Sequence, residues 1–231
     1  MLLFFDMEFT GLQQNTTPIS IGIVSEDGKS FYAEFTDYDE SQCNDWINEN
    51  VIHNLYLSHI LWHSQCLENI ENLKNKGYVI SQNPHFPRQN AILEYDYFKT
   101  DNNGNMEALG DSCWVGLALG EWLQQFGTIQ FVSDVCHYDF VLLIDLLTNG
   151  GTALDLPDNI SAVCHDLNMD IARHFHVSDR EAFDMSREQI MNDLCGTEDI
   201  VTGDKHNSLY DAEVIRAIWK EIGNVTELQR I

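Results

Sequence analysis

The chain has 231 residues, of which 44% are hydrophobic and 11% aromatic, so it can bury the core of one large domain. Its 37 acidic and 12 basic residues give a formal net charge of -25, which argues against a protein that grips phosphate backbones through a broad basic surface. Any nucleic-acid partner would have to be held locally, by metal ions and a few placed contacts.

The composition shows no internal boundary, so we expect a single domain over residues 1–231. The apolar run at the N-terminus stops at Asp6 and is too short for a signal peptide, and no stretch of the sequence approaches a membrane span. We therefore expect a soluble, cytoplasmic protein without a membrane partner. The 6 cysteines are scattered singly, which favours buried, reduced thiols over a disulfide framework.

Residues 2–9 are predicted to form the first strand, and two carboxylates, Asp6 and Glu8, interrupt its apolar run. Because strand side chains alternate between faces, both carboxylates point the same way, about 6 to 7 Å apart. Residues 3, 5, 7 and 9 take the other face. A strand that is apolar on both sides is usually buried, which makes two like charges unfavourable unless a cation lies between them.

The sequence offers few cations for this task, because Lys29 is the only basic residue before Lys74. A bound divalent ion is the simplest solution, and oxygen ligands select hard ions such as magnesium or manganese. The alternative is a strand end that emerges into solvent, where the carboxylates need no partner.

Two further strands and two helices are predicted before residue 80. Residues 17–25 and 30–35 alternate, with a turn signal at 26–29, so the first three strands are expected to form a meander. Helical spacing follows at 42–51, with Ser41 as the expected N-cap, and at 55–76. Residues 84–111 break this rhythm, and we interpret them as an insertion or long hairpin that contains a possible strand at 91–98. This segment is either a lid over the site or a surface elaboration.

The second half of the chain alternates helices and strands. Helices are predicted at 112–126, 138–147, 166–175, within 178–195 and at 208–222, strands at 128–133 and near 161–164, and a polar loop at 196–205. This order predicts an α/β fold with a mixed central sheet, made of the three-strand meander plus further strands, and with helices on both faces.

A third acidic position follows the strand at 128–133. Asp139 stands at the start of the next predicted helix, where a carboxylate can face Asp6 and Glu8 across the end of the sheet. Asp134 is a rival that lies closer to the strand, although capping of the following turn would also explain it. We favour Asp139, for which electrostatics at a helix N-terminus is the alternative role.

Near the C-terminus, His206 precedes Asp211 by five positions. On one continuous helix the two side chains would lie about 140° apart. They converge only if His206 stands on the preceding loop, which Gly203 makes adjustable, while Asp211 occupies the first helical turn. A histidine near a metal-held water suits proton abstraction close to neutral pH, whereas a surface histidine at a helix start is the common structural alternative.

Taken together, these residues resemble the DEDDh 3′-to-5′ exonuclease family. The resemblance rests on Asp6-x-Glu8, on residues 138–143 (YDFVLL) around Asp139, and on His206-x-x-x-x-Asp211 followed by alanine. Residues 18–24 (PISIGIV), 31–33 (FYA) and 44–51 (NDWINENV) are similar to the RNase AS-type exoribonucleases within that family. The segment 84–111 departs from the compact pattern of the family.

The resemblance implies an RNase H-like fold with two divalent ions, Mg²⁺ or Mn²⁺, held by Asp6, Glu8, Asp139 and Asp211. It implies that His206 acts as the general base and that the products are nucleoside monophosphates. A second implied set, the residues that touch the terminal nucleotide, comprises Phe9, Thr10, Gly11 and Leu12. The expected substrate is a single-stranded or short 3′ end, with RNA slightly preferred over DNA, and a homodimer is plausible for the family.

Two other functions stay open at this stage: a 3′-to-5′ exonuclease of single-stranded DNA, and an acidic binding or inhibitory module on the same fold without catalysis. A zinc site at His59 and His63, with His53 nearby, is not favoured because no third soft ligand has suitable local spacing. Trp46 is expected to belong to the core rather than to a platform for base stacking.

Overall fold

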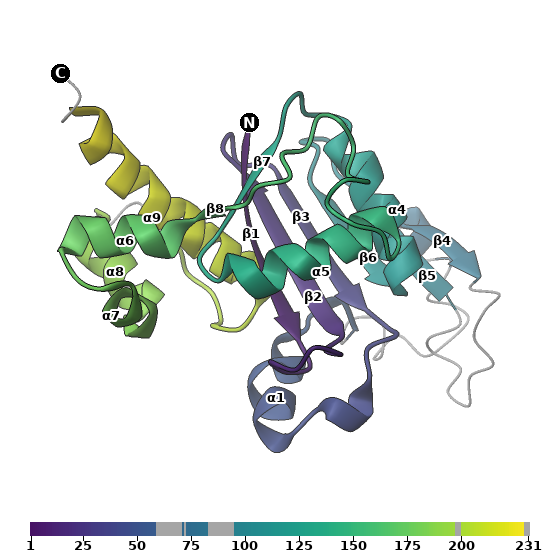
Figure 1. The fold of residues 1–231 in the computed structure, drawn as a ribbon. Helices are drawn as coiled ribbons and strands as arrows, with labels where there is room; N and C mark the ends of the chain where they lie inside the picture. The colour runs from purple at the N-terminus through teal and green to yellow at the C-terminus, as the bar shows by residue number, and fades with distance from the viewer. Residues whose placement is uncertain (59–70, 72, 83–94, 197–199, 229–231) are drawn as a thin grey trace.

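The computed structural model describes residues 1–58, 71, 73–82, 95–196 and 200–228. Its centre is an eight-stranded mixed sheet in the order β4-β5-β6-β3-β2-β1-β7-β8 (Figure 1). The strands are β1 (Leu2–Phe9), β2 (Pro18–Ser25), β3 (Ser30–Phe35), β4 (Val79–Gln82), β5 (Tyr95–Thr100), β6 (Met106–Gly110), β7 (Gln130–Ser133) and β8 (His165–Asp166).

The half of the sheet that carries the candidate site is an antiparallel meander extended by parallel strands. β1 pairs with β2 and β2 with β3 in antiparallel fashion, whereas β7 runs parallel to β1 and β8 parallel to β7. The predicted meander is therefore confirmed. With helices on both faces, this mixed sheet is an α/β fold of the RNase H-like type, as the sequence predicted.

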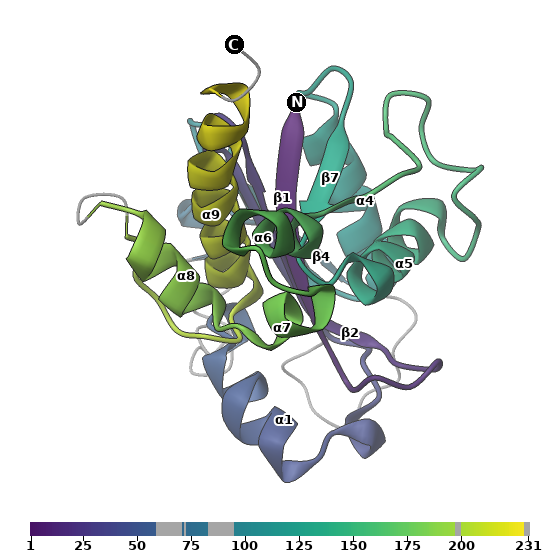
Figure 2. The same cartoon turned by 60° about the vertical axis from the view of Figure 1, so that its left-hand side comes forward.

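Helices cover both faces of the sheet. Figure 2, in which the sheet is seen nearly edge-on, shows α9 on one side and α4 and α5 on the other. Among the described residues, the helices with assigned bounds are α1 (Asp45–Asn50), α4 (Ser112–Leu123), α5 (Cys136–Thr148), α6 (Leu167–Phe175), α7 (Asp179–Asp184), α8 (Arg187–Leu194) and α9 (Ser208–Leu228), with short 3₁₀ turns at Glu40–Gln42 and Ile52–Asn54.

Alternation along β1 divides the core into two clusters. Leu3, Phe5 and Met7 pack with residues of α4 and α5 in one cluster, and Phe4 packs with residues of α6 to α9 in the other. The even-numbered face of β1, which also carries Asp6, is thus the face that α9 covers. A strand buried on both faces is the setting that the apolar run of the sequence predicts.

Several predicted boundaries are wrong. The N-cap of the first helix is Asn44, whose side chain accepts a hydrogen bond from the Ile47 amide, and not Ser41. The short strand expected near 161–164 forms at His165–Asp166, where parallel pairing to β7 supplies its hydrogen bonds. The helical stretch within 178–195 is two helices, separated at Met185 and Ser186, because Ser186 caps a new helix.

Within the segment 84–111, the described residues form β5 and β6, an antiparallel pair that extends the sheet beyond β3. Most of the helix predicted at 55–76, part of the strand predicted at 91–98, and the histidines at 59 and 63 lie outside the described residues. The single-domain expectation stays a prediction.

Among the described residues, no helix combines the length and apolar character needed to cross a membrane.

Candidate active site

The end of β1 presents two carboxylates on the face under α9. Asp6 pairs in register with Gly22 of β2, and the register shifts between Glu8 and Phe9, where the strand becomes irregular. Such an irregularity turns the chain at the end of a strand and re-aims the side chains beside it. Asp6 and Glu8 both line a cleft of about 820 Å³, which lies in the size range of ligand-binding pockets.

Gly22 brings the start of α9 onto the sheet beside Asp6. A Cβ atom at this position would lie 2.2 Å from the Leu209 amide nitrogen, so only glycine allows the backbone of α9 to come this close. The contact is strengthened by a hydrogen bond of 3.0 Å between the buried hydroxyls of Ser208 and Ser20. The first turn of α9 therefore delivers Asp211 to the same cleft.

His206 stands on the loop before α9, as convergence with Asp211 requires. Its backbone has a φ of 63°, in the left-handed region that is uncommon for residues other than glycine. This conformation lets the His206 amide donate a hydrogen bond of 2.9 Å to Asp211 Oδ2. The imidazole Nδ1 lies 3.5 Å from Glu8 Oε1, and ligand atoms of Glu8, His206 and Asp211 all fall within 4.8 Å of one another.

Asp139 occupies the first turn of α5 and is only 2% exposed. Its Oδ2 accepts a hydrogen bond of 2.6 Å from the hydroxyl of Ser133, the last residue of β7. The structure thus brings Asp139 to the same cleft as Asp6, Glu8, His206 and Asp211. Asp134, its rival in the sequence, lines the cleft as well but forms an ion pair with Arg187.

Burial opposes ionisation of all four carboxylates, and repulsion between carboxylates adds to it for Asp6, Asp139 and Asp211. Burial raises the pKa of Asp6 well above 3.8, and the negative charges of Asp139, Glu8 and Asp211 raise it further. Burial also raises the pKa of Glu8 and Asp139, although His206 and Ser133 respectively counteract part of the effect. For Asp211, burial followed by the charge of Glu8 raises the pKa to about 7.

This donor set suits divalent cations. The four side chains offer carboxylate oxygens, the ligands that magnesium and manganese prefer. Two divalent ions would compensate the four negative charges that burial and repulsion otherwise disfavour. The residues present therefore fit the metal pair that the family resemblance implies.

Residues 9–12 form one rim of the cleft. Gly11 has a φ of 150°, which residues with a Cβ atom rarely adopt, so this turn favours glycine. The Tyr138 hydroxyl donates a hydrogen bond of 3.0 Å to the Leu12 carbonyl, and the Tyr138 ring stacks on Phe9 with 5.8 Å between centroids. This anchoring leaves the Leu12 side chain 69% exposed at the rim.

Thr10 differs from its neighbours because its side chain is 1% exposed. Its hydroxyl donates to Gln42 Oε1 at 2.6 Å and accepts from the Thr17 amide at 3.0 Å. The buried Thr10 side chain thus ties the rim segment 9–12 to Thr17 and Gln42.

The expectation that Trp46 belongs to the core is wrong. Its side chain is 52% exposed, lines the cleft, and meets the His206 ring edge-on with 5.0 Å between centroids. Phe183, at 49% exposure, lines the cleft from α7. Periodicity alone did not reveal these side chains, since an exposed aromatic residue on a short helix has the same spacing as a buried one.

Two cations line the cleft, and carboxylates neutralise both. Arg187 Nε lies 2.6 Å from Asp134 Oδ2, and Lys205 Nζ lies 3.3 Å from Glu188 Oε1. The described part of the cleft therefore carries no excess of positive charge with which to attract a long polyanion. This arrangement agrees with the acidic composition of the whole chain.

Comparison with known proteins gives a partial similarity. The chain is 36% identical over 52 residues to the 3′-5′ exoribonuclease Rv2179c of Mycobacterium tuberculosis H37Rv and to the 3′-5′ exoribonuclease MT2234.1 of M. tuberculosis CDC 1551. The matched stretch is 22% of this chain and 31% of each relative, so the chain spans about a third of the curated relatives it matches. No family model matches the chain.

Proposed function

We propose that the protein is a metal-dependent 3′-to-5′ exonuclease that releases nucleoside monophosphates. The observation that carries this proposal is the convergence of Asp6, Glu8, Asp139 and Asp211 with His206 in one cleft of an RNase H-like fold. The partial similarity to two 3′-5′ exoribonucleases supports the same reaction and favours RNA over DNA as the substrate.

In this proposal, Asp6, Glu8, Asp139 and Asp211 hold two Mg²⁺ or Mn²⁺ ions. When bound, such ions activate water as a nucleophile and stabilise the charge that develops on the leaving oxygen. Two of the carboxylates have their own support in the protein, since the Ser133 hydroxyl holds Asp139 and the His206 amide holds Asp211. Fixed ligands of this kind give up little freedom when they bind an ion.

His206 is the proposed general base. The Glu8 carboxylate raises its pKa, while burial acts in the opposite direction, so the imidazole titrates above its ordinary value of 6.5 in the metal-free protein. Its strained backbone and its edge-on contact with Trp46 hold the ring at the cleft. There the imidazole can accept the proton of a water that attacks the last phosphodiester, while the 3′ oxygen of the shortened chain leaves and is protonated by solvent.

The exposed apolar side chains of the cleft suit the bases of an unpaired 3′ end. Leu12, Trp46 and Phe183 present apolar surface, and base stacking on aromatic side chains contributes about 1–3 kcal/mol per base. Because carboxylates neutralise both cations of the cleft, we propose short or single-stranded ends rather than long duplexes as substrates.

The proposal is tested with matched RNA and DNA oligonucleotides that carry a 5′ label. We expect stepwise 3′ shortening and release of nucleoside 5′-monophosphates with magnesium or manganese, and none with EDTA. Asp6→Asn is the matched variant, because it keeps the size of the side chain and removes one ligand charge; it should reduce shortening to background. Absence of 3′ shortening with every divalent ion, for protein that is shown to be folded, would refute the activity. Faster degradation of long blunt duplexes would refute the preference for unpaired ends.

A further inference from the structure

A fifth carboxylate, Asp134, stands beside the four that form the candidate metal site. β1 and β7 pair in parallel, with Phe4 opposite Val132, and both of these side chains belong to the core cluster under α9. Asp134 lies in the bend directly after Ser133, the last residue of β7, and lines the same cleft as Asp6. The topology therefore makes Asp134 a natural competitor for the ions that Asp6 would hold.

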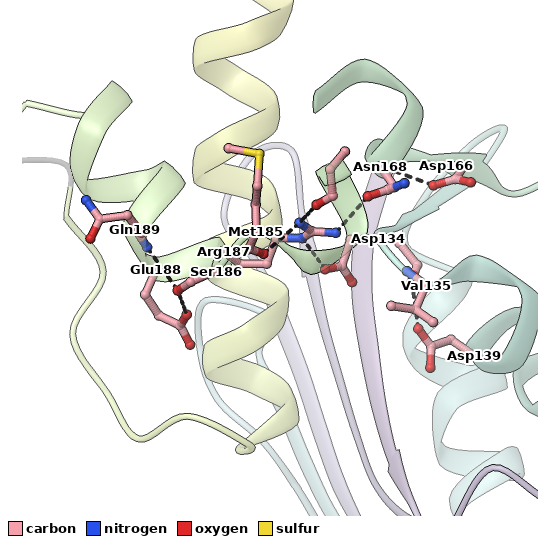
Figure 3. Close-up of polar contacts among 12 residues, drawn as sticks. Asp134, Val135, Asp139, Asp166, Asn168, Met185, Ser186, Arg187, Glu188 and Gln189 are labelled. Atoms are coloured by element: carbon pink, nitrogen blue, oxygen red, sulfur yellow. Dashed lines mark hydrogen bonds and ion pairs between the residues drawn. The ribbon is translucent and has the colours of Figure 1, made fainter. Parts of the chain in front are cut away.

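Arg187 binds this competitor. Its Nε donates a hydrogen bond of 2.6 Å to Asp134 Oδ2 (Figure 3). The two side chains are only 14% and 12% exposed. A charge-assisted contact of this length, partly shielded from water, is stronger than a surface ion pair. Asp134 is thereby fixed toward α8.

The remaining contacts of Arg187 hold the guanidinium in place. Nη1 donates to the carbonyls of Ala182 at 2.8 Å and Met185 at 3.1 Å, at the end of α7. Nη2 donates to Asn168 Oδ1 at 3.0 Å, on α6. The Ala182 carbonyl also accepts a hydrogen bond of 3.2 Å from the Met185 amide. Carbonyls at the end of a helix carry partial negative charge, so a cation beside them is favourable. Arg187 thus links α6, α7 and the end of β7 through a single side chain.

The negative charge of Asp134 acts on three carboxylates of the candidate metal site. Asp134 raises the pKa of Asp6, Asp139 and Asp211, although burial contributes more to each of the three shifts. An Asp134 without its cation would therefore act as an additional anion close to the proposed ligands. Arg187 offsets this negative charge and fixes the orientation of the Asp134 side chain.

We propose that Arg187 is a positioning residue that withholds Asp134 from the metal site, so that four carboxylates and not five meet the ions. This inference rests on the proposed function for its metal site, but it makes a statement about ion binding that is measured without any substrate.

The test uses Mn²⁺ as the probe and follows its free concentration by electron paramagnetic resonance in titrations of the purified protein. Arg187→Met releases Asp134 as an extra ligand, and we expect Mn²⁺ to bind about fivefold more tightly. Asp134→Asn leaves the Arg187 cation uncompensated beside the site, and we expect Mn²⁺ to bind about fivefold more weakly. Shifts of opposite sign cannot arise from a general loss of structure.

The double variant Asp134→Asn, Arg187→Met removes both charges and should restore the Mn²⁺ affinity to within about twofold of the wild type. Arg180→Met is the control, because Arg180 forms an exposed ion pair with Asp184 on the outside of α7; it should leave Mn²⁺ binding unchanged. In the exonuclease assay, Arg187→Met should lower kcat more than it changes KM, and the double variant should recover kcat.

Equal Mn²⁺ affinities for the wild type and Arg187→Met would overturn the proposal. It would also be overturned if the Mn²⁺ affinity of the double variant were as far from the wild-type value as that of Arg187→Met. If Arg187→Met does not fold, Asp134→Asn decides the question: an Mn²⁺ affinity equal to or higher than that of the wild type would overturn the proposal. Wild-type protein that binds Mn²⁺ but shortens no oligonucleotide would refute the proposed activity and leave this comparison intact.

Discussion

Replacement of Asp211 by asparagine should stabilise the metal-free protein. The folded-state pKa of Asp211 is raised to about 7 from an ordinary value of 3.8, first by burial and then by the charge of Glu8. A carboxyl group with a raised folded-state pKa contributes stability below its unfolded pKa, and this contribution is lost as the pH rises through the folded pKa. The wild type should therefore lose stability between pH 3.8 and about 7 when no metal is bound.

The loss of unfolding free energy follows from the difference between the ordinary and the folded-state pKa of Asp211. The difference between 3.8 and about 7 corresponds to about 4 kcal/mol of unfolding free energy, an upper limit because neighbouring carboxylates share the repulsion. Asparagine cannot ionise, yet its side-chain oxygen can still accept the hydrogen bond from the His206 amide. At pH 8 in EDTA, Asp211→Asn should thus be more stable than the wild type by up to about 4 kcal/mol.

Urea denaturation followed by circular dichroism measures this difference at pH 4 and pH 8. Asp145→Asn, which removes the same charge from an exposed position on α5, is the control and should change stability little. Saturating magnesium should stabilise the wild type more than Asp211→Asn, because the variant lacks a ligand. Asp211→Asn that is no more stable than the wild type at pH 8 in EDTA would refute the reasoning.

Three further predictions concern the site. His206→Ala should lower kcat by about 10²- to 10⁴-fold while Mn²⁺ binding persists; an unchanged rate in single-turnover assays would exclude His206 as the base. Gly22→Ala places a Cβ 2.2 Å from the Leu209 amide nitrogen, so it should lower both the melting temperature and the activity. Gly120→Ala is the control and should change neither, because a Cβ there would meet no atom of the described residues within 4 Å beyond its own helix. Equal melting temperatures for Gly22→Ala and the wild type would contradict the close packing of α9. Trp46→Ala removes a 52% exposed ring, so it should raise KM for oligonucleotides without loss of stability in urea; an unchanged KM would argue against base contacts.

Local patterns were sufficient for strands β1, β2, β3 and β7 and for part of the site, whereas β4 and β6 were not predicted. Alternation placed Asp6 and Glu8 on one face of β1 and Leu3, Phe5 and Met7 on the other, and the structure has this arrangement. The spacing of His206 and Asp211 required a loop position for the histidine, and its left-handed backbone before α9 meets this requirement. Such predictions succeed because they depend on periods of two or 3.6 residues within one element.

The features that the sequence did not predict depend on contacts between distant elements. The ion pair of Asp134 with Arg187 joins residues 53 positions apart, and no local pattern relates them. Gly22 has the spacing of an ordinary strand residue, and only the approach of α9 explains it. The exposure of Trp46 likewise follows from where α1 packs and not from the spacing within it.

The most direct test of the central claim is a crystal structure of the protein with bound Mn²⁺, in which anomalous scattering locates the ions. We expect two manganese peaks in the cleft, with Asp6, Glu8, Asp139 and Asp211 as their carboxylate ligands and with Asp134 still paired to Arg187. Peaks elsewhere on the molecule, with none among these four carboxylates, would contradict it.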